Sequence, residues 1–169
     1  YHTYQTPQSW EQSPSEGVTY GASYTPMDSV GLYVPGGRAI YPSSVVMNAV
    51  PATIAGVKSI VMVSPPQSNG KIPSSVLVAA DRCGITQIYK VGGAQAIFAL
   101  AYSASSVPKV DKIVGPGNIY VTVAKQQVFG AVAIDKPAGP SEVLVYVTDP
   151  KYAPYAASEL LAQLEPVSY

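Results

Sequence analysis

The sequence predicts an α/β fold in which a mostly parallel sheet carries helices on both faces. Strand-like apolar runs alternate with helical patterns along the chain. Residues 59–63 (Ser-Ile-Val-Met-Val) form a continuous apolar run, which is typical of a strand buried on both faces. Several of the runs end in glycine-rich turns that lead into helical patterns, most clearly Lys-Ile-Val-Gly-Pro-Gly-Asn at residues 112–118.

The first 16 residues are predicted to form an arm. They contain two prolines and scattered polar residues, with a short helical turn expected around Trp10. Residues 17–24 alternate weakly between apolar and polar side chains, which fits an edge strand. We therefore expect an N-terminal arm over residues 1–16 and a single domain over residues 17–169.

The first firmly predicted strand covers residues 30–34, and a helix should follow its Pro-Gly-Gly turn. Ser43 and Ser44 are candidate N-caps for this helix, and Gly56 is a candidate C-cap. Pro51 lies inside the helical pattern and should kink or restart the helix there.

The remaining elements follow the same alternation. Pro73 and Ser74 begin a helix that Gly84 ends, and residues 94–102 form an apolar helix too short for a membrane and therefore central. Further strands are expected over residues 87–91, 111–114 and 143–147, and further helices over residues 119–129 and 155–164. We expect the strands at 59–63, 87–91 and 111–114 to be the central ones.

Because strand-to-helix turns of a parallel sheet share one edge, this edge is the predicted site. Tyr33, Gln95 and Asn118 follow three different strands and should meet there. A tyrosine ring can stack on a base or ribose, and the amides can donate and accept hydrogen bonds. Asn118 could equally cap the helix that follows it. The fourth turn of this kind contains Ser141.

Composition excludes several classes of function. The formal net charge is zero, so no basic surface for nucleic acid or membrane is present. No run approaches the roughly 20 apolar residues of a membrane span, and we expect a soluble, cytoplasmic protein. The single cysteine, Cys83, is best explained as a buried free thiol. The single histidine, His2, argues against a Ser-His-Asp triad or a histidine-rich metal site within this chain.

Other motifs are missing or weak. The chain has no GxxxxGK[ST] loop and no GxGxxG fingerprint, and its carboxylates are too scattered to suggest an acid–base pair. Charged residues make up only 12% of the chain, about half the usual share, while 13 residues are tyrosine. Either partner domains cover this surface or the surface is not an ordinary natural one, and we expect the chain to be a segment of something larger.

Four sequence blocks, taken in order and spacing, resemble histidinol dehydrogenase. The blocks are Val-Gly-Leu-Tyr-Val-Pro-Gly-Gly (30–37), Val-Gly-Gly-Ala-Gln-Ala (91–96), Val-Asp-Lys-Ile-Val-Gly-Pro-Gly-Asn (110–118) and Ala-Gly-Pro-Ser-Glu-Val-Leu-Val (138–145). The resemblance implies a zinc-dependent homodimer that oxidises L-histidinol to L-histidine through histidinaldehyde, with two NAD, in histidine biosynthesis. It further implies that this chain is the family's first large domain, an incomplete Rossmann-like unit that carries the nucleotide.

The resemblance also assigns roles to residues. Tyr33, Gln95 and Asn118 match NAD-contacting positions, Ser141 matches a substrate-contacting position, and Gln163 matches a zinc ligand near the substrate. The family has a zinc-binding histidine three residues after that glutamine, where this chain has Pro166. The catalytic Glu-His pair and the other zinc ligands belong to a later part of the family chain. No catalytic residue is therefore assigned here, and tight zinc binding is not expected.

Two hypotheses remain at this point. The chain is the NAD-binding domain of a histidinol dehydrogenase, or it is an engineered or isolated α/β scaffold that retains the turns without binding NAD or catalysing a reaction. The glycine turns favour the first hypothesis, whereas the low charge, the many tyrosines and Pro166 favour the second.

Overall fold

The structure is a computed structural model that describes residues 1–36, 40–104, 106–136 and 143–162. The chain divides into two units, Tyr1–Ala138 and Gly139–Tyr169. Among the described residues, no helix has the length and apolar character needed to cross a membrane.

The first unit is built on a five-stranded sheet in the order β5-β4-β3-β6-β7. Its strands are β3 (Ser29–Tyr33), β4 (Ser59–Val63), β5 (Gln87–Tyr89), β6 (Lys112–Val114) and β7 (Ala133–Ile134). Every pair of neighbouring strands is parallel. The predicted parallel α/β fold is confirmed.

The predicted choice of central strands is partly wrong. The middle strand is β3, which has four buried residues out of five, while β5 lies at one end of the order. In β5, Gln87 is exposed and the other two residues are half-buried. A run of three or four apolar residues fits an edge strand as well as a central one, so the sequence alone does not distinguish them.

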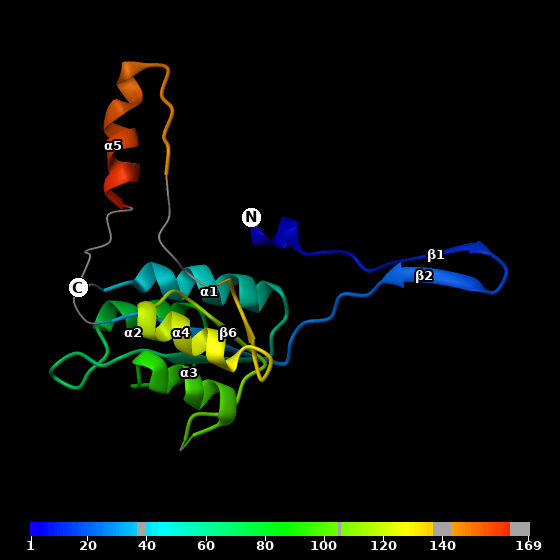
Figure 1. The fold of residues 1–169 in the computed structure, drawn as a ribbon, viewed down its shortest axis with the longest axis horizontal. Coiled ribbons are helices and arrows are strands. Elements are labelled where there is room, and N and C mark those ends of the chain that lie inside the picture. The colour runs from blue at the N-terminus through cyan, green and yellow to red at the C-terminus, as the bar shows by residue number, and fades with distance from the viewer. Residues whose placement is uncertain (37–39, 105, 137–142, 163–169) are drawn as a thin grey trace. The chain divides into compact units, whose positions relative to one another are not determined.

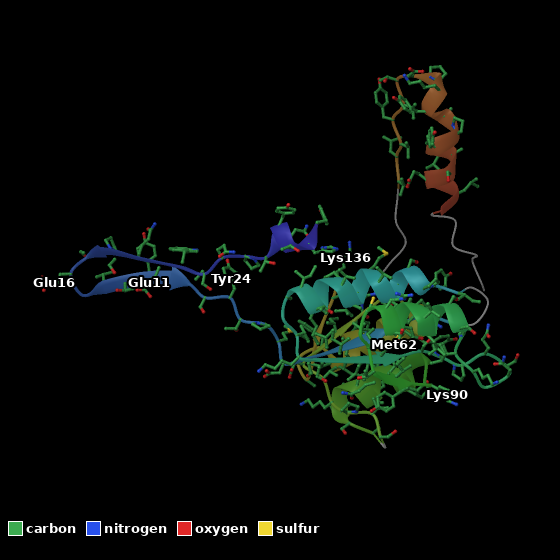
Figure 2. All side chains as sticks on the ribbon, turned by 180° about the vertical axis from the view of Figure 1, so that it is seen from behind. Glu11, Glu16, Tyr24, Met62, Lys90 and Lys136 are labelled. Atoms are coloured by element: carbon green, nitrogen blue, oxygen red, sulfur yellow. The ribbon has the colours of Figure 1, made fainter. Side chains whose placement is uncertain are left out.

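Four helices cover the two faces of the sheet: α1 (Pro42–Ile54), α2 (Ser74–Arg82), α3 (Gly93–Tyr102) and α4 (Ile119–Val128). Alternate residues of β3 and β4 face opposite sides, because side chains alternate along a strand. Leu32 and Met62 pack with α1 and α2, whereas Val61 and Val63 pack with α3 and α4. Figure 1 shows α1 and α3 on opposite sides of the sheet, and Figure 2 shows Met62 inside the unit. Helices on both faces are thus confirmed.

Proline and glycine mark the helix boundaries better than serine does. The prediction that Ser43 or Ser44 caps α1 is wrong, because the helix begins at Pro42 with Tyr41 in the N-cap position and no side-chain cap. Proline suits the first helical position, since its fixed φ is already helical and its missing N–H would be unpaired there. Pro51 lies within α1, and Gly56 follows the helix with a φ of +85°. Gly84, at φ +74°, follows α2 in the same way.

The N-terminal segment is more regular than predicted. It contains a short 3-10 helix, η1 (His2–Gln5), and an antiparallel hairpin of β1 (Trp10–Ser15) and β2 (Val18–Ala22). The helical turn expected around Trp10 is wrong: Trp10 begins β1 and its ring meets Tyr20 edge to face at 5.9 Å. The expected edge strand exists, but it pairs with β1. The expected boundary after Glu16 falls in the hairpin turn, and Figure 2 marks Glu16 there.

The described part of the second unit contains η2 (Pro150–Tyr152) and α5 (Ala153–Ala162). The strand expected over residues 143–147 is wrong, because these residues form no strand. Leu144 and Tyr146 are 92% and 86% exposed, and the described residues of this unit include no strand with which they could pair. Apolar alternation predicts a strand only where a neighbour completes its hydrogen bonds.

Candidate functional site at the carboxyl edge of the sheet

The glycine-rich turns meet at the carboxyl edge of the sheet because the strands are parallel and in register. Tyr33 pairs with Val63, Val63 with Tyr89, and Leu32 with Val114. The turns after β3, β4, β5 and β6 therefore leave the sheet side by side. We call this edge, with the turns that follow the strands, the carboxyl rim.

Three of these turns pack together through Pro65, which follows β4. A Cβ atom added at Gly92 would lie 2.4 Å from Cβ of Pro65, and one added at Gly36 would lie 2.9 Å from the Pro65 carbonyl oxygen. Real Cβ atoms do not approach other atoms this closely. Glycine at these two positions is therefore required by the close approach of Pro65.

Tyr33 lies beneath the rim and connects two elements. Its side chain is 3% exposed, and its hydroxyl oxygen accepts a hydrogen bond from Gly93 N–H at 3.1 Å. The end of β3 is thereby tied to the first residue of α3. Burial raises the pKa of the Tyr33 hydroxyl above its ordinary value, and the hydrogen bond from Gly93 opposes this with a smaller effect. Stacking on a base or ribose needs an exposed ring face, which Tyr33 does not offer in this structure.

Gln95 is exposed in the first turn of α3. Its amide oxygen lies close to Gly93, where an added Cβ atom would be 2.9 Å away. Gly93 adopts a φ of +64°, and Gly92 in the N-cap position offers no side chain to cap the helix. The amide of Gln95 therefore lies beside a helix N-terminus that lacks a side-chain cap, where N–H groups favour an anionic or hydrogen-bond-accepting group.

Asn118 is exposed and caps α4. Its Oδ1 atom accepts a hydrogen bond from Val121 N–H at 3.1 Å. Of the two roles considered for Asn118, capping is present in the structure. Capping does not exclude the other role, because the amide nitrogen has no partner within the described part of the chain.

An ion pair between a buried lysine and a half-buried aspartate adjoins this turn, and sequence reasoning missed it. Lys125, on the inner face of α4, is 5% exposed and forms an ion pair with Asp135, which follows β7. Lys125 Nζ also donates to the Gly115 carbonyl oxygen at 2.8 Å, and Asp135 Oδ2 accepts from Gly115 N–H at 2.8 Å. One signal for Lys125 was present, since it shares a helix face with Val121 and Val128.

The structure does not describe the predicted substrate and metal residues. Ser141, Gln163 and Pro166 are outside the described residues. Within the described ranges, no three His, Cys, Asp or Glu residues are grouped as a metal site would require. His2 is hydrogen-bonded to Gln5, and Cys83 is a half-buried free thiol that packs against the core.

The rim residues do not line either of two large cavities found in the described residues. One cavity, of about 330 Å³, lies between the N-terminal segment and the end of α1. The other, also of about 330 Å³, lies near the start of β6 and the residues after α4. Neither is lined by Tyr33, Gln95 or Asn118.

The fold and the rim place the chain among the open parallel α/β proteins. In this class, ligands bind outside the carboxyl ends of the strands. The rim offers two exposed amides and two helix N-termini. At Gly36 and Gly92 the turns pack so closely that they leave no room for a side chain.

Comparison with known proteins defines the family. The family model described as histidinol dehydrogenase matches residues 1–167, so the chain belongs to the histidinol dehydrogenase family. It is 56% identical over 165 residues to a histidinol dehydrogenase of Halalkalibacterium halodurans, covering 98% of this chain and 39% of that one. A histidinol dehydrogenase of Methanothermobacter thermautotrophicus is 52% identical with the same coverage.

A solved structure agrees with the sequence relatives. The crystal structure of histidinol dehydrogenase from Elizabethkingia anophelis superposes with a TM-score of 0.86 at 42% identity. The match covers 96% of this chain and 38% of that one. The chain thus spans just under two fifths of the length of these relatives.

Proposed function

We propose that this chain is the NAD-binding part of a histidinol dehydrogenase, an oxidoreductase of histidine biosynthesis that converts L-histidinol to L-histidine. The observation that supports this most strongly is the exposure of two amides at the carboxyl rim of this chain, which belongs to the family. Gln95 and Asn118 present these amides beside the N-termini of α3 and α4. A dinucleotide combines anionic phosphates with hydroxyl groups, and this set of donors fits both.

Each rim residue has a defined task in this proposal. The Asn118 amide nitrogen donates to a phosphate or ribose oxygen while Oδ1 keeps the helix cap, and Gln95 donates and accepts beside α3. Tyr33 contributes from below by holding Gly93. Bound NAD supplies a hydride acceptor, and the residues of this chain bind and orient it.

The substrate and metal parts of the site are less complete in this chain. We assign Ser141 to the substrate, L-histidinol, and Gln163 to the substrate and, in the family, to zinc. The described residues do not fit a zinc ion, since they contain no group of three candidate ligands. No step of the reaction is therefore assigned to zinc. The enzyme is cytoplasmic and homodimeric in this proposal, and none of the residues assigned here is a catalytic residue or a dimer contact.

A second candidate function is that of a folded scaffold without NAD binding. The rim favours it in one respect, because neither large cavity includes the proposed cofactor residues. Small-molecule sites usually bury most of their ligand, so an open rim needs additional walls. The rest of the family's chain could supply such walls. Adding that part should increase NAD binding if the chain is the NAD-binding part of the enzyme, and should leave NAD unbound if the chain is a scaffold.

Calorimetric titration with NAD distinguishes the two. We expect weak binding to the 169-residue chain and tighter binding once it is extended with the C-terminal part of the Halalkalibacterium relative. Asn118→Ala serves as the site control in both proteins. If the extended protein is folded and neither protein takes up NAD, the proposed function is wrong and the scaffold remains.

A further inference from the structure

Gly115 has both of its backbone polar groups bound to one ion pair, which joins the buried Lys125 to the half-buried Asp135. Its carbonyl oxygen accepts from Lys125 Nζ at 2.8 Å, and its N–H donates to Asp135 Oδ2 at 2.8 Å. The two charged residues come from different elements, α4 and the segment after β7. The position and direction of the Gly115 peptide are therefore set by side chains well outside the turn.

The backbone at Gly115 has little freedom to move in any other way. Its φ is +113°, and an added Cβ atom would lie 2.1 Å from the Tyr33 carbonyl oxygen. The turn then passes through Pro116 and Gly117 to Asn118, whose side chain caps α4. A shift at Gly115 is thus transmitted within three residues to the Asn118 amide and the N-terminus of α4.

The charges are not needed to fill space. Lys125 is 5% exposed and lies on the helix face that also carries Val121 and Val128, both of which fill this face with apolar side chains. Removing a lysine from water costs free energy that an ion pair only partly offsets, so a buried pair is weak evidence for stability. A more specific explanation is that the pair fixes a particular backbone geometry at the rim.

We propose that Lys125 and Asp135 are positioning residues for the cofactor: they orient the Gly115–Asn118 turn so that Asn118 and the start of α4 face the dinucleotide. This inference rests on the proposed function. It adds two residues that touch no ligand and act only through the turn.

The test measures NAD affinity by calorimetry in four proteins: the unaltered 169-residue chain, Asp135→Asn, Lys125→Met and the double variant. We expect each single variant to weaken NAD binding about tenfold or more, and the double variant to be no weaker than the worse single one, because the two residues act as a unit. In nuclear magnetic resonance spectra, the amide signals of Gly115 and Asn118 should shift in every variant.

Asp111→Asn is the matched control. The Asp111 carboxylate also accepts from a backbone N–H, that of Ser29 at 2.9 Å, but at the amino ends of β3 and β6. This substitution removes the charge from a comparable hydrogen-bond acceptor, and NAD affinity should stay within about twofold of the unaltered chain.

The outcomes separate the two proposals. If the unaltered chain, alone and extended, binds no NAD, the proposed function fails and this inference fails with it. If the unaltered chain binds NAD and the folded Asp135→Asn variant binds it equally well, only the positioning role is overturned. Should the charge-removing variants not fold, Asp135→Glu keeps both charges but moves the carboxylate by one methylene group. Undiminished NAD affinity in that variant, with a shifted Gly115 amide signal, also overturns the positioning role.

Discussion

At the scale of single residues, Asn118 combines a structural contact with the proposed ligand contact, and the two can be separated by substitution. Its Oδ1 atom satisfies Val121 N–H, whereas its amide nitrogen is directed to no partner within the described residues. Alanine removes both groups. Aspartate keeps an oxygen for the cap and removes only the amide donor.

Asn118→Ala should lower the free energy of unfolding by about 1 kcal/mol through loss of the cap, and weaken NAD binding by about 1–3 kcal/mol. Asn118→Asp should keep the stability, because aspartate caps helices as well as asparagine does, yet lose NAD affinity through the missing donor and repulsion of phosphate. Urea denaturation and calorimetry measure the two effects. Unchanged NAD affinity in a folded Asn118→Ala protein would remove Asn118 from the site and leave residues 115–117 as structure alone.

Tyr33 offers a second prediction at this scale, one that depends on pH. Tyr33→Phe leaves the Gly93 N–H without its acceptor, so the free energy of unfolding at pH 7 should fall by about 1 kcal/mol. Burial, opposed by the weaker effect of the Gly93 hydrogen bond, raises the Tyr33 pKa in the folded state. The folded protein therefore holds this proton more tightly than the unfolded chain.

The resulting stabilisation is complete below the unfolded pKa of about 10 and is lost as the pH rises through the folded pKa. Unfolding in urea between pH 7 and pH 11 should show a steeper alkaline loss for the unaltered chain than for Tyr33→Phe. Tyr120→Phe, which changes an exposed tyrosine on α4, should follow the unaltered chain. Parallel curves for Tyr33→Phe and the unaltered chain would contradict the prediction.

At the scale of elements, the turn after β6 depends on glycine more than the turn after α4 does. Gly115 and Gly130 have similar φ values, +113° and +102°. An added Cβ atom meets the Tyr33 carbonyl oxygen at 2.1 Å at Gly115, but nothing within 4 Å at Gly130. The two positions therefore share backbone strain and differ in steric contact.

Gly115→Ala should reduce the free energy of unfolding by about 4 kcal/mol or more, since its clash is with backbone inside the sheet. Gly130→Ala should cost only the strain of a positive φ, about 1–2 kcal/mol. Guanidinium denaturation of both variants gives the difference directly. Equal losses would show that the turn at Gly115 can move away from β3.

Elements were predictable from sequence where the pattern is local. The apolar run at 59–63 is β4 to the residue, and Gly84 follows α2 as expected, whereas Gly56 lies one residue beyond the C-cap of α1, which is Ala55. The order of strands was not predictable, because a run of apolar residues does not name its neighbour. The two-residue strand β7 is too short to show any period, and the hairpin of β1 and β2 includes Pro14 and only exposed or half-buried residues.

At the scale of the whole molecule, the parallel sheet brings the carboxyl ends of strands that are distant in sequence to one edge, as predicted, while the NAD contacts assigned to residues at that edge stay a prediction. Tyr33 is the last residue of β3, Gln95 lies in the first turn of α3, and Asn118 is the N-cap residue of α4. The depth of each residue could not be predicted, and Tyr33 lies beneath the rim rather than on it. The pairing of Lys125 with Asp135 was missed because both residues bind the backbone of Gly115, and they reach it only once α4 and β7 have packed together.

The metal content of the chain gives a last prediction at this scale. A structural or catalytic zinc ion needs three or four ligands drawn from histidine, cysteine and carboxylates. The described residues contain no group of three such side chains, and in the sequence Pro166 occupies the position where the family resemblance implies a histidine. Gln163 alone supplies one neutral oxygen, which is a weak zinc ligand.

We therefore expect well under one equivalent of zinc in elemental analysis after dialysis against a mild chelator. Pro166→His adds a second ligand and should still fall short of stoichiometric binding, whereas the protein extended with the rest of the family's chain should retain zinc better than either. Stoichiometric zinc in the unaltered 169-residue chain would mean that ligands outside the described residues assemble without the remainder of the enzyme.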